Sequence, residues 1–156
     1  MAIFYTGASG VGTGPHLDFR VWDVADNRYI NPNEFTDLLM VNDEPLVDQF
    51  AMTSGYGERS APVYGASTFH QGIDYATPVN TPVEIKDSKY LTTFNDNTGG
   101  RISQYATMRD GKAYDIVLLH GSNQNQILTQ GPIIDFDYSC LLILFIALKT
   151  ILFKMV

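Results

Sequence analysis

The stretch from Phe50 to Ser122 most constrains the fold, because it consists of short alternating apolar and polar runs. Glycine, proline and asparagine interrupt these runs every few residues, for example in FHQGIDYA and KYLTTFNDNTGG. Alternation with a period of two is typical of strands with one buried face, and such breakers are typical of turns. The Asp110-Gly111 pair between ISQYATM and AYDIVLL is a strong hairpin signal. We therefore predict an all-β fold of antiparallel strands.

One short helix, about two turns long, is expected near residues 32–40. Asn31 suits the N-cap, Pro32 suits the first helical position and Glu34 the third. The following segment VNDEPLVDQ, residues 41–49, is acidic and contains a proline, which indicates a connector rather than a regular element.

Composition excludes several classes of function. A chain of 156 residues with a net charge of −7 and no cluster of lysine or arginine is a poor binder of nucleic acid or anionic membrane. The lone Cys140 excludes an intrachain disulfide framework and a zinc knuckle. The segment MAIFYTGASG lacks the basic and apolar regions of a secretory signal, so we expect synthesis in the cytoplasm without a signal peptide.

The last segment, residues 136–156, is predicted to be an apolar tail with Lys149 inside it. A membrane span needs about 20 apolar residues, and an internal lysine costs about 2.5–3.5 kcal/mol on insertion scales. Three interpretations stay open: a membrane anchor, a helix packed on this protein or on a partner, and a non-native tail.

The chain has three histidines, and each lies in a setting that suggests chemistry. In TGPHLDFRV, His16 and Asp18 are two residues apart, a spacing that places both on one face of a strand. In FHQGIDYA, His70 and Asp74 are four apart and again share a face, and an imidazole with a carboxylate is ordinary zinc ligation. His120 follows the apolar run YDIVLL. Together these settings favour a metal site over three unrelated surface histidines.

The combined motifs closely resemble a known family, the lysostaphin/LytM-type zinc endopeptidases, which cut peptide bonds in bacterial peptidoglycan. SGYGER followed by FHQGIDYATPVNTPVEI is similar to the entry motif of that family. TGPHLDFRV is similar to its closing signature, in which Gly-Pro-His-Leu-His-Phe opens the last core strand. YDIVLLHGS is similar to the strand between them, and RYINPNEFTDLL to the sequence that often follows the closing signature.

The order of these motifs differs from that of the family, because here the closing signature comes first. The resemblance therefore implies a circularly permuted domain at residues 1–135. Residues 1–40 correspond to the C-terminal part of the family, residues 41–49 join the old end to the old beginning, and residues 50–135 correspond to the N-terminal part. Permutation is tolerated when the original termini lie close together on the surface.

The resemblance also implies roles for individual residues. His70 and Asp74 match two zinc ligands, His16 matches the histidine that acts as base, and His120 matches the histidine that stabilises the oxyanion. Asp18 stands where the family has its third zinc ligand, a histidine. Its carboxylate oxygen is as many bonds from Cα as a histidine Nδ1, so Asp18 is a candidate ligand, for zinc or for a harder divalent metal.

Four further residues near the motifs are candidates for binding substrate. Tyr56, Tyr64 and Tyr75 are expected either to wall a groove for a peptide or to be ordinary half-buried strand tyrosines. Arg59 is expected either to steer an acidic stem peptide or to be a solvated loop charge.

Two functions follow as expectations. The first is a metal-dependent endopeptidase acting on peptidoglycan peptides at the bacterial cell wall, delivered by a phage particle and in contact with phage structural proteins. The alternative is a degenerate member of the fold that has lost catalysis and serves as a structural or cell-wall-binding module. Loss of the third ligand histidine at position 18 favours the alternative. A third possibility is a small membrane-tethered protein dominated by its tail.

Overall fold

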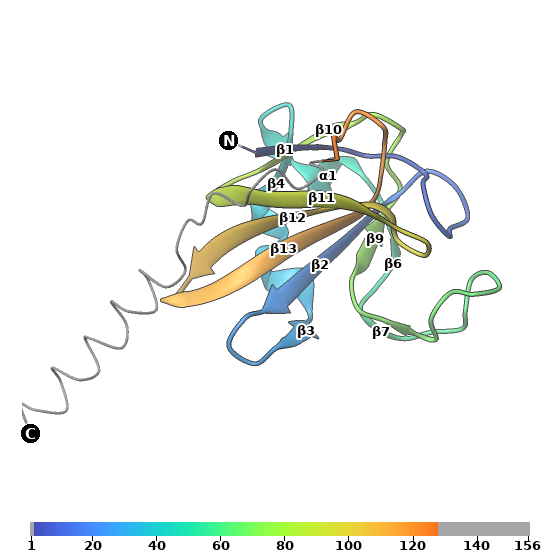
Figure 1. Cartoon of the computed structure of the whole chain (residues 1–156), viewed down its shortest axis with the longest axis horizontal. Coiled ribbons are helices and arrows are strands. Elements are labelled where there is room, and N and C mark those ends of the chain that lie inside the picture. Colours follow the sequence, from blue (N-terminus) through green and yellow to red (C-terminus); the bar gives the residue numbers. More distant parts are fainter. Residues whose placement is uncertain (1, 128–156) are drawn as a thin grey trace, which may run out of the picture.

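The computed structural model describes residues 2–127, and antiparallel strands dominate it, which confirms the all-β prediction (Figure 1). The largest sheet contains β2 (Leu17–Asp23), β3 (Arg28–Ile30), β6 (Met52–Ser54), β9 (Ile73–Tyr75), β11 (Ser88–Asp96), β12 (Gly100–Arg109) and β13 (Lys112–Gly121). Its order is β11-β12-β13-β2-β9-β6, with β3 also paired to β2.

A second sheet, ordered β1-β10-β4-β5, contains β1 (Ala2–Tyr5), β4 (Leu39–Val41), β5 (Glu44–Pro45) and β10 (Pro82–Ile85). A small two-stranded sheet pairs β7 (Gly57–Glu58) with β8 (Phe69–His70).

The core lies between the two larger sheets, which pack face to face (Figure 1). On β2, Leu17, Phe19 and Val21 are fully buried and belong to the main core cluster. Because side chains alternate along a strand, Asp18 and Arg20 point to the opposite face of the sheet. The core thus fixes where the charged residues of β2 are presented.

The predicted helix is present at the expected place, as the 3-10 helix η1 (Pro32–Leu38). The side chain of Asn31 accepts a hydrogen bond from the backbone N–H of Asn33, and proline occupies the start of the helix. The helix ends at Leu38 because Leu39 begins β4. The expected connector at residues 41–49 is more regular than predicted, since it holds β5 and the short helix α1 (Leu46–Gln49).

The predicted hairpin at Asp110-Gly111 is confirmed. It joins β12 to β13, and both turn residues have positive φ, 51° and 73°. This is the backbone conformation that an Asp-Gly pair adopts in a two-residue hairpin turn.

The strand expected to begin in TGPHLDFRV starts later than predicted. Pro15 has no backbone N–H, and His16 makes only an isolated bridge with Gly7, so β2 begins at Leu17. The strand β1, which the sequence did not predict, precedes it and pairs with β10.

The apolar tail expected at residues 136–156 lies outside the described residues, as does the predicted domain boundary at residue 135. Within residues 2–127, no helix has the length and apolar character needed to cross a membrane.

Candidate metal centre

A buried cluster forms where the central strand β2 meets β9. Asp18 on β2 is the direct register partner of Asp74 on β9, so the two carboxyl groups come from adjacent strands. His70 lies on β8, four residues before Asp74, and its side chain is 1% exposed. Ligand atoms of Asp18, His70 and Asp74 all lie within 4.8 Å of one another, so these three residues can hold a metal ion.

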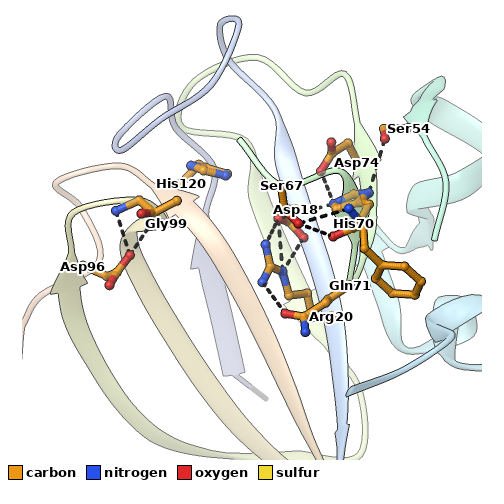
Figure 2. A network of polar contacts seen from close by, with 12 residues as sticks. Asp18, Arg20, Ser54, Ser67, His70, Gln71, Asp74, Asp96, Gly99 and His120 are labelled. Atoms are coloured by element: carbon orange, nitrogen blue, oxygen red, sulfur yellow. Dashed lines mark hydrogen bonds and ion pairs between the residues drawn. The ribbon is translucent and has the colours of Figure 1, made fainter. Parts of the chain in front are cut away.

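The imidazole of His70 is oriented by its surroundings (Figure 2). Its Nδ1 lies 3.0 Å from the backbone oxygen of Gly55, to which an Nδ1–H donates. That tautomer leaves Nε2 facing the two carboxylates, 3.2 Å from Oδ1 of Asp74 and 3.5 Å from Oδ2 of Asp18. A histidine ligand held through its other ring nitrogen in this way is the usual arrangement in metal sites.

Two atoms of the cluster lack a hydrogen-bond partner among the described residues. They are Nε2 of His70 and Oδ1 of Asp74, both fully buried. The two atoms are close, but they do not meet in hydrogen-bonding geometry. Buried polar atoms are rarely left without a partner, and an ion is one of the groups that satisfies them. The donor set therefore fits a divalent cation.

Without a metal, the cluster favours a protonated imidazole. Burial by itself lowers the pKa of His70, but the carboxylates of Asp18 and Asp74 outweigh burial and raise that pKa to about 9. For Asp18, burial by itself raises the pKa, whereas the nearby imidazole of His70 and the guanidinium of Arg20 hold it well below the ordinary value of an aspartate. A positive charge is thus favoured between Nε2 of His70 and the two carboxylates, whether a proton on the imidazole or a metal ion supplies it.

Each carboxylate of the cluster is also paired with an arginine. Arg20 donates from Nε to Oδ1 of Asp18 at 3.0 Å and from Nη2 to Oδ2 at 2.7 Å. Arg59 donates from Nη1 to Oδ2 of Asp74 at 3.2 Å and to the hydroxyl of Ser54 at 2.6 Å. The four side chains carry two negative and two positive charges, so they are neutral together.

His16 and His120 form a separate pair close to the cluster. Their ring centroids are 4.3 Å apart, and each Nδ1 lies within hydrogen-bonding distance of a backbone oxygen, from Gly14 for His16 and from Ser9 for His120. Burial, and to a lesser degree the neighbouring His16, lower the pKa of His120. The negative charges of Asp18 and Asp74 act in the opposite direction and raise the pKa of the same imidazole, but burial outweighs them. With Nδ1–H donated to the backbone, each Nε2 is left as the ring nitrogen that can accept a proton.

The structure therefore brings Asp18, His70 and Asp74 into one cluster and sets His16 beside His120. His16 lies in an isolated bridge with Gly7 directly before β2, which begins at Leu17, and its ring contacts that of His120. The antiparallel register of β2 against β13, in which Asp18 is opposite Leu119, brings His16 beside His120.

The residues proposed to bind substrate occupy three different environments. Tyr75 requires a correction, because it is 4% exposed and packs in the main core instead of walling a groove. Tyr64 is fully exposed, and Tyr56 packs edge-to-face on Phe69. Arg59 is not a solvated loop charge, since it is tied to Asp74, and it also borders a cleft of about 530 Å³ lined by Glu58, Arg59, Ser60, Thr68 and Phe69.

Sequence reasoning missed two contributors to the cluster. Arg20 is two residues from Asp18, the spacing of same-face neighbours on a strand, and this spacing was the available signal. The backbone oxygen of Gly55 carried no signal, because any residue has a carbonyl.

Gly72, between His70 and Asp74, is required by close contacts. A Cβ at this position would lie 2.4 Å from Oδ1 of Asp18 and 2.6 Å from the backbone oxygen of Phe19. We expect Gly72→Ala to lower the free energy of unfolding of the metal-free protein by about 1–3 kcal/mol, the usual cost of overpacking, as measured by urea denaturation. Gly55→Ala is the matched control, because a Cβ there meets nothing within 4 Å. Equal stability of the two variants would contradict the close packing at Gly72.

Comparison with models of protein families, with curated proteins and with solved structures finds no match for this chain.

Proposed function

We propose that this chain is a metal-dependent endopeptidase that cleaves peptide bonds in bacterial peptidoglycan, built on a circularly permuted lysostaphin/LytM-type domain. The observation that carries the proposal is the buried group of Asp18, His70 and Asp74, in which Nε2 of His70 lacks a hydrogen-bond partner among the described residues. The motifs that resemble the family contain all three of these residues.

Zinc is the metal we propose for this group, held by Nε2 of His70 and by one carboxylate oxygen each from Asp18 and Asp74. One nitrogen and two oxygen ligands suit zinc, and three protein ligands are typical of catalytic zinc sites. Another divalent metal with a preference for oxygen is compatible with the same set. When bound, such a metal supplies Lewis-acid polarisation of the scissile carbonyl and activation of a water molecule.

His16 and His120 would handle the proton and the developing negative charge. His120 has a lowered pKa, so it is neutral near pH 7, and its Nδ1 is engaged by the backbone of Ser9. His16 is only half-buried, so its ring is accessible to solvent and substrate. We assign the role of general base to His16. Oxyanion stabilisation by His120, the role that the family resemblance implies, requires Nε2 of His120 to carry a proton when the oxyanion forms, while Nδ1–H stays bonded to the backbone of Ser9.

The sheet topology supports the permutation. β2, which carries the closing signature, lies between β9, which carries Asp74, and β13, which ends near His120, and it is antiparallel to both. A strand early in the chain thus occupies the centre of the large sheet, between the strands that carry the other two motifs (Figure 1).

Purified protein offers a direct test. We expect about one zinc ion per chain by metal analysis and clearing of peptidoglycan in a zymogram, abolished by a chelator and restored by zinc. Digests should gain free amino groups without gaining reducing sugar ends, which separates a peptidase from a glycosidase. Absence of bound metal together with absence of clearing would contradict the proposal.

A second candidate function is a degenerate module that binds cell wall or has a structural role. The Arg20–Asp18 ion pair favours it, because a guanidinium already balances the charge of the carboxylate at the third ligand position. In that case the purified protein binds peptidoglycan, or a structural partner, without cleaving it.

Site of action and partners follow from the proposed substrate. We propose that the protein acts at the bacterial cell wall, with the peptide of peptidoglycan as its partner. Delivery on a phage particle, in contact with phage structural proteins, is the route we propose for it. Nucleic acid is not a proposed partner, given the net charge of −7.

A further inference from the structure

We propose that Arg20 cancels the charge of Asp18. The two side chains then form a neutral pair, and the site binds a divalent cation less tightly than it would with the aspartate alone. The inference rests on the proposed metal site and adds to it a determinant of metal affinity. It concerns one contact, between neighbouring residues of the same strand face.

The contact is close and well fixed. Arg20 makes three hydrogen bonds to the two oxygens of Asp18, at 2.7, 3.0 and 3.2 Å. The side chain of Asp18 is 4% exposed and that of Arg20 is 21% exposed, so solvent screens the pair only in part. The guanidinium also lies 5.7 Å from the ring centroid of Tyr29, on the neighbouring strand β3, and 3.5 Å from Oε1 of Gln71.

The same carboxylate faces the candidate metal position. Oδ2 of Asp18, which accepts the shortest bond from Arg20, is the oxygen that lies 3.5 Å from Nε2 of His70. A carboxylate has about four lone-pair sites, so it can accept from arginine and still offer a lone pair to an ion. Arg20 therefore does not block the site sterically, but its positive charge opposes any cation that uses this oxygen.

A purely structural role for Arg20 makes the opposite prediction. If the guanidinium only holds Asp18 in place, its loss frees the carboxylate and weakens metal binding. If Arg20 acts through its charge, its loss leaves Asp18 with uncompensated negative charge, and metal binding becomes tighter. The sign of the change in affinity separates the two roles.

Titration calorimetry with Zn²⁺ alone, on the full chain near pH 7, measures this sign. We expect Arg20→Gln to tighten zinc binding by at least about tenfold, because a unit positive charge near the ion is removed. Arg20→Lys keeps the charge and should stay within about threefold of wild type. Arg109→Gln is the matched control, since Arg109 is similarly buried but pairs with Asp37, outside the cluster, and it should leave the affinity unchanged.

Each outcome decides one of the two proposals. Weaker or unchanged zinc binding by Arg20→Gln overturns the role of Arg20 and leaves the metal site standing. Zinc binding by Arg20→Gln but not by wild type supports the role of Arg20 and overturns the proposed metal-dependent activity of the natural chain. Failure of both proteins to bind zinc overturns both. If Arg20→Gln does not unfold cooperatively, Arg20→Met replaces it, with the same expected tightening.

Discussion

Replacing His70 by alanine should abolish tight zinc uptake, whereas replacing His16 should leave zinc bound and abolish hydrolysis. Nε2 of His70 faces both carboxylates of the cluster, so its loss removes the only nitrogen donor of the group. Loss of an outer-shell partner typically costs 10–100-fold in metal affinity, and loss of a ligand should exceed about 100-fold. His16 contacts His120 and is absent from the ligand group, so its removal should cost about 10²–10⁴-fold in rate, the usual contribution of a general base.

The two variants control each other when zinc content and peptidoglycan hydrolysis are measured on the same preparations. Both should remain folded, because each carboxylate of the cluster keeps its arginine. A similar loss of zinc in both would show that the roles of His16 and His70 are misassigned.

Asp18→Ala should abolish both stoichiometric metal binding and cleavage if Asp18 is a working ligand. The substitution removes one of only two carboxylates in the ligand group and leaves the guanidinium of Arg20 without its carboxylate partner. Zinc affinity should fall by more than about 100-fold, since the remaining site has lost a ligand and gained a net positive charge. Zymograms in zinc, in manganese and without metal measure the accompanying loss of activity.

Asp18→His separates the endopeptidase from the degenerate module. If the natural site is degenerate, wild type is inert, and the imidazole restores the two-histidine, one-aspartate set that the family resemblance implies. An imidazole in place of a carboxylate also leaves more net charge on the metal, which lowers the pKa of its bound water. If Asp18→Ala is as active as wild type, Asp18 is not a ligand.

Local chemistry made parts of the fold predictable. The Asp110-Gly111 turn was predictable because few residue pairs adopt positive φ at two consecutive positions. The helix at residues 32–38 was predictable from the capping side chain of Asn31 and the proline that follows it. Strand β1 was missed because AIFY alternates too briefly to distinguish a strand from any short apolar run.

Residue spacing by itself predicted the site only where its residues are close in sequence, and Asp18 was added to His70 and Asp74 by the family resemblance. The spacing of His70 and Asp74 predicted that they lie close together, but they lie on separate strands, β8 and β9, and not on one face of a single strand. The spacing of Asp18 and Arg20 would have indicated an ion pair. The approach of Asp18 to Asp74 depends on the pairing of β2 with β9, and no local pattern encodes that register. The proximity of His16 to His120 depends on the pairing of β2 with β13, in which Asp18 is the register partner of Leu119.

The central position of β2 also has a consequence for how the chain acquires its fold. β2 pairs locally with β3, but its other edge pairs with β13, where Asp18 meets Leu119 roughly 100 residues later in the chain. At a synthesis rate of about 5–20 residues per second, roughly 5–20 s pass before that partner exists. Domains dominated by such distant pairings fold slowly, and an apolar strand with an open edge is a template for aggregation until it is covered. A chain that ends before β13 would therefore be expected to accumulate as insoluble material, whatever the state of its metal ligands.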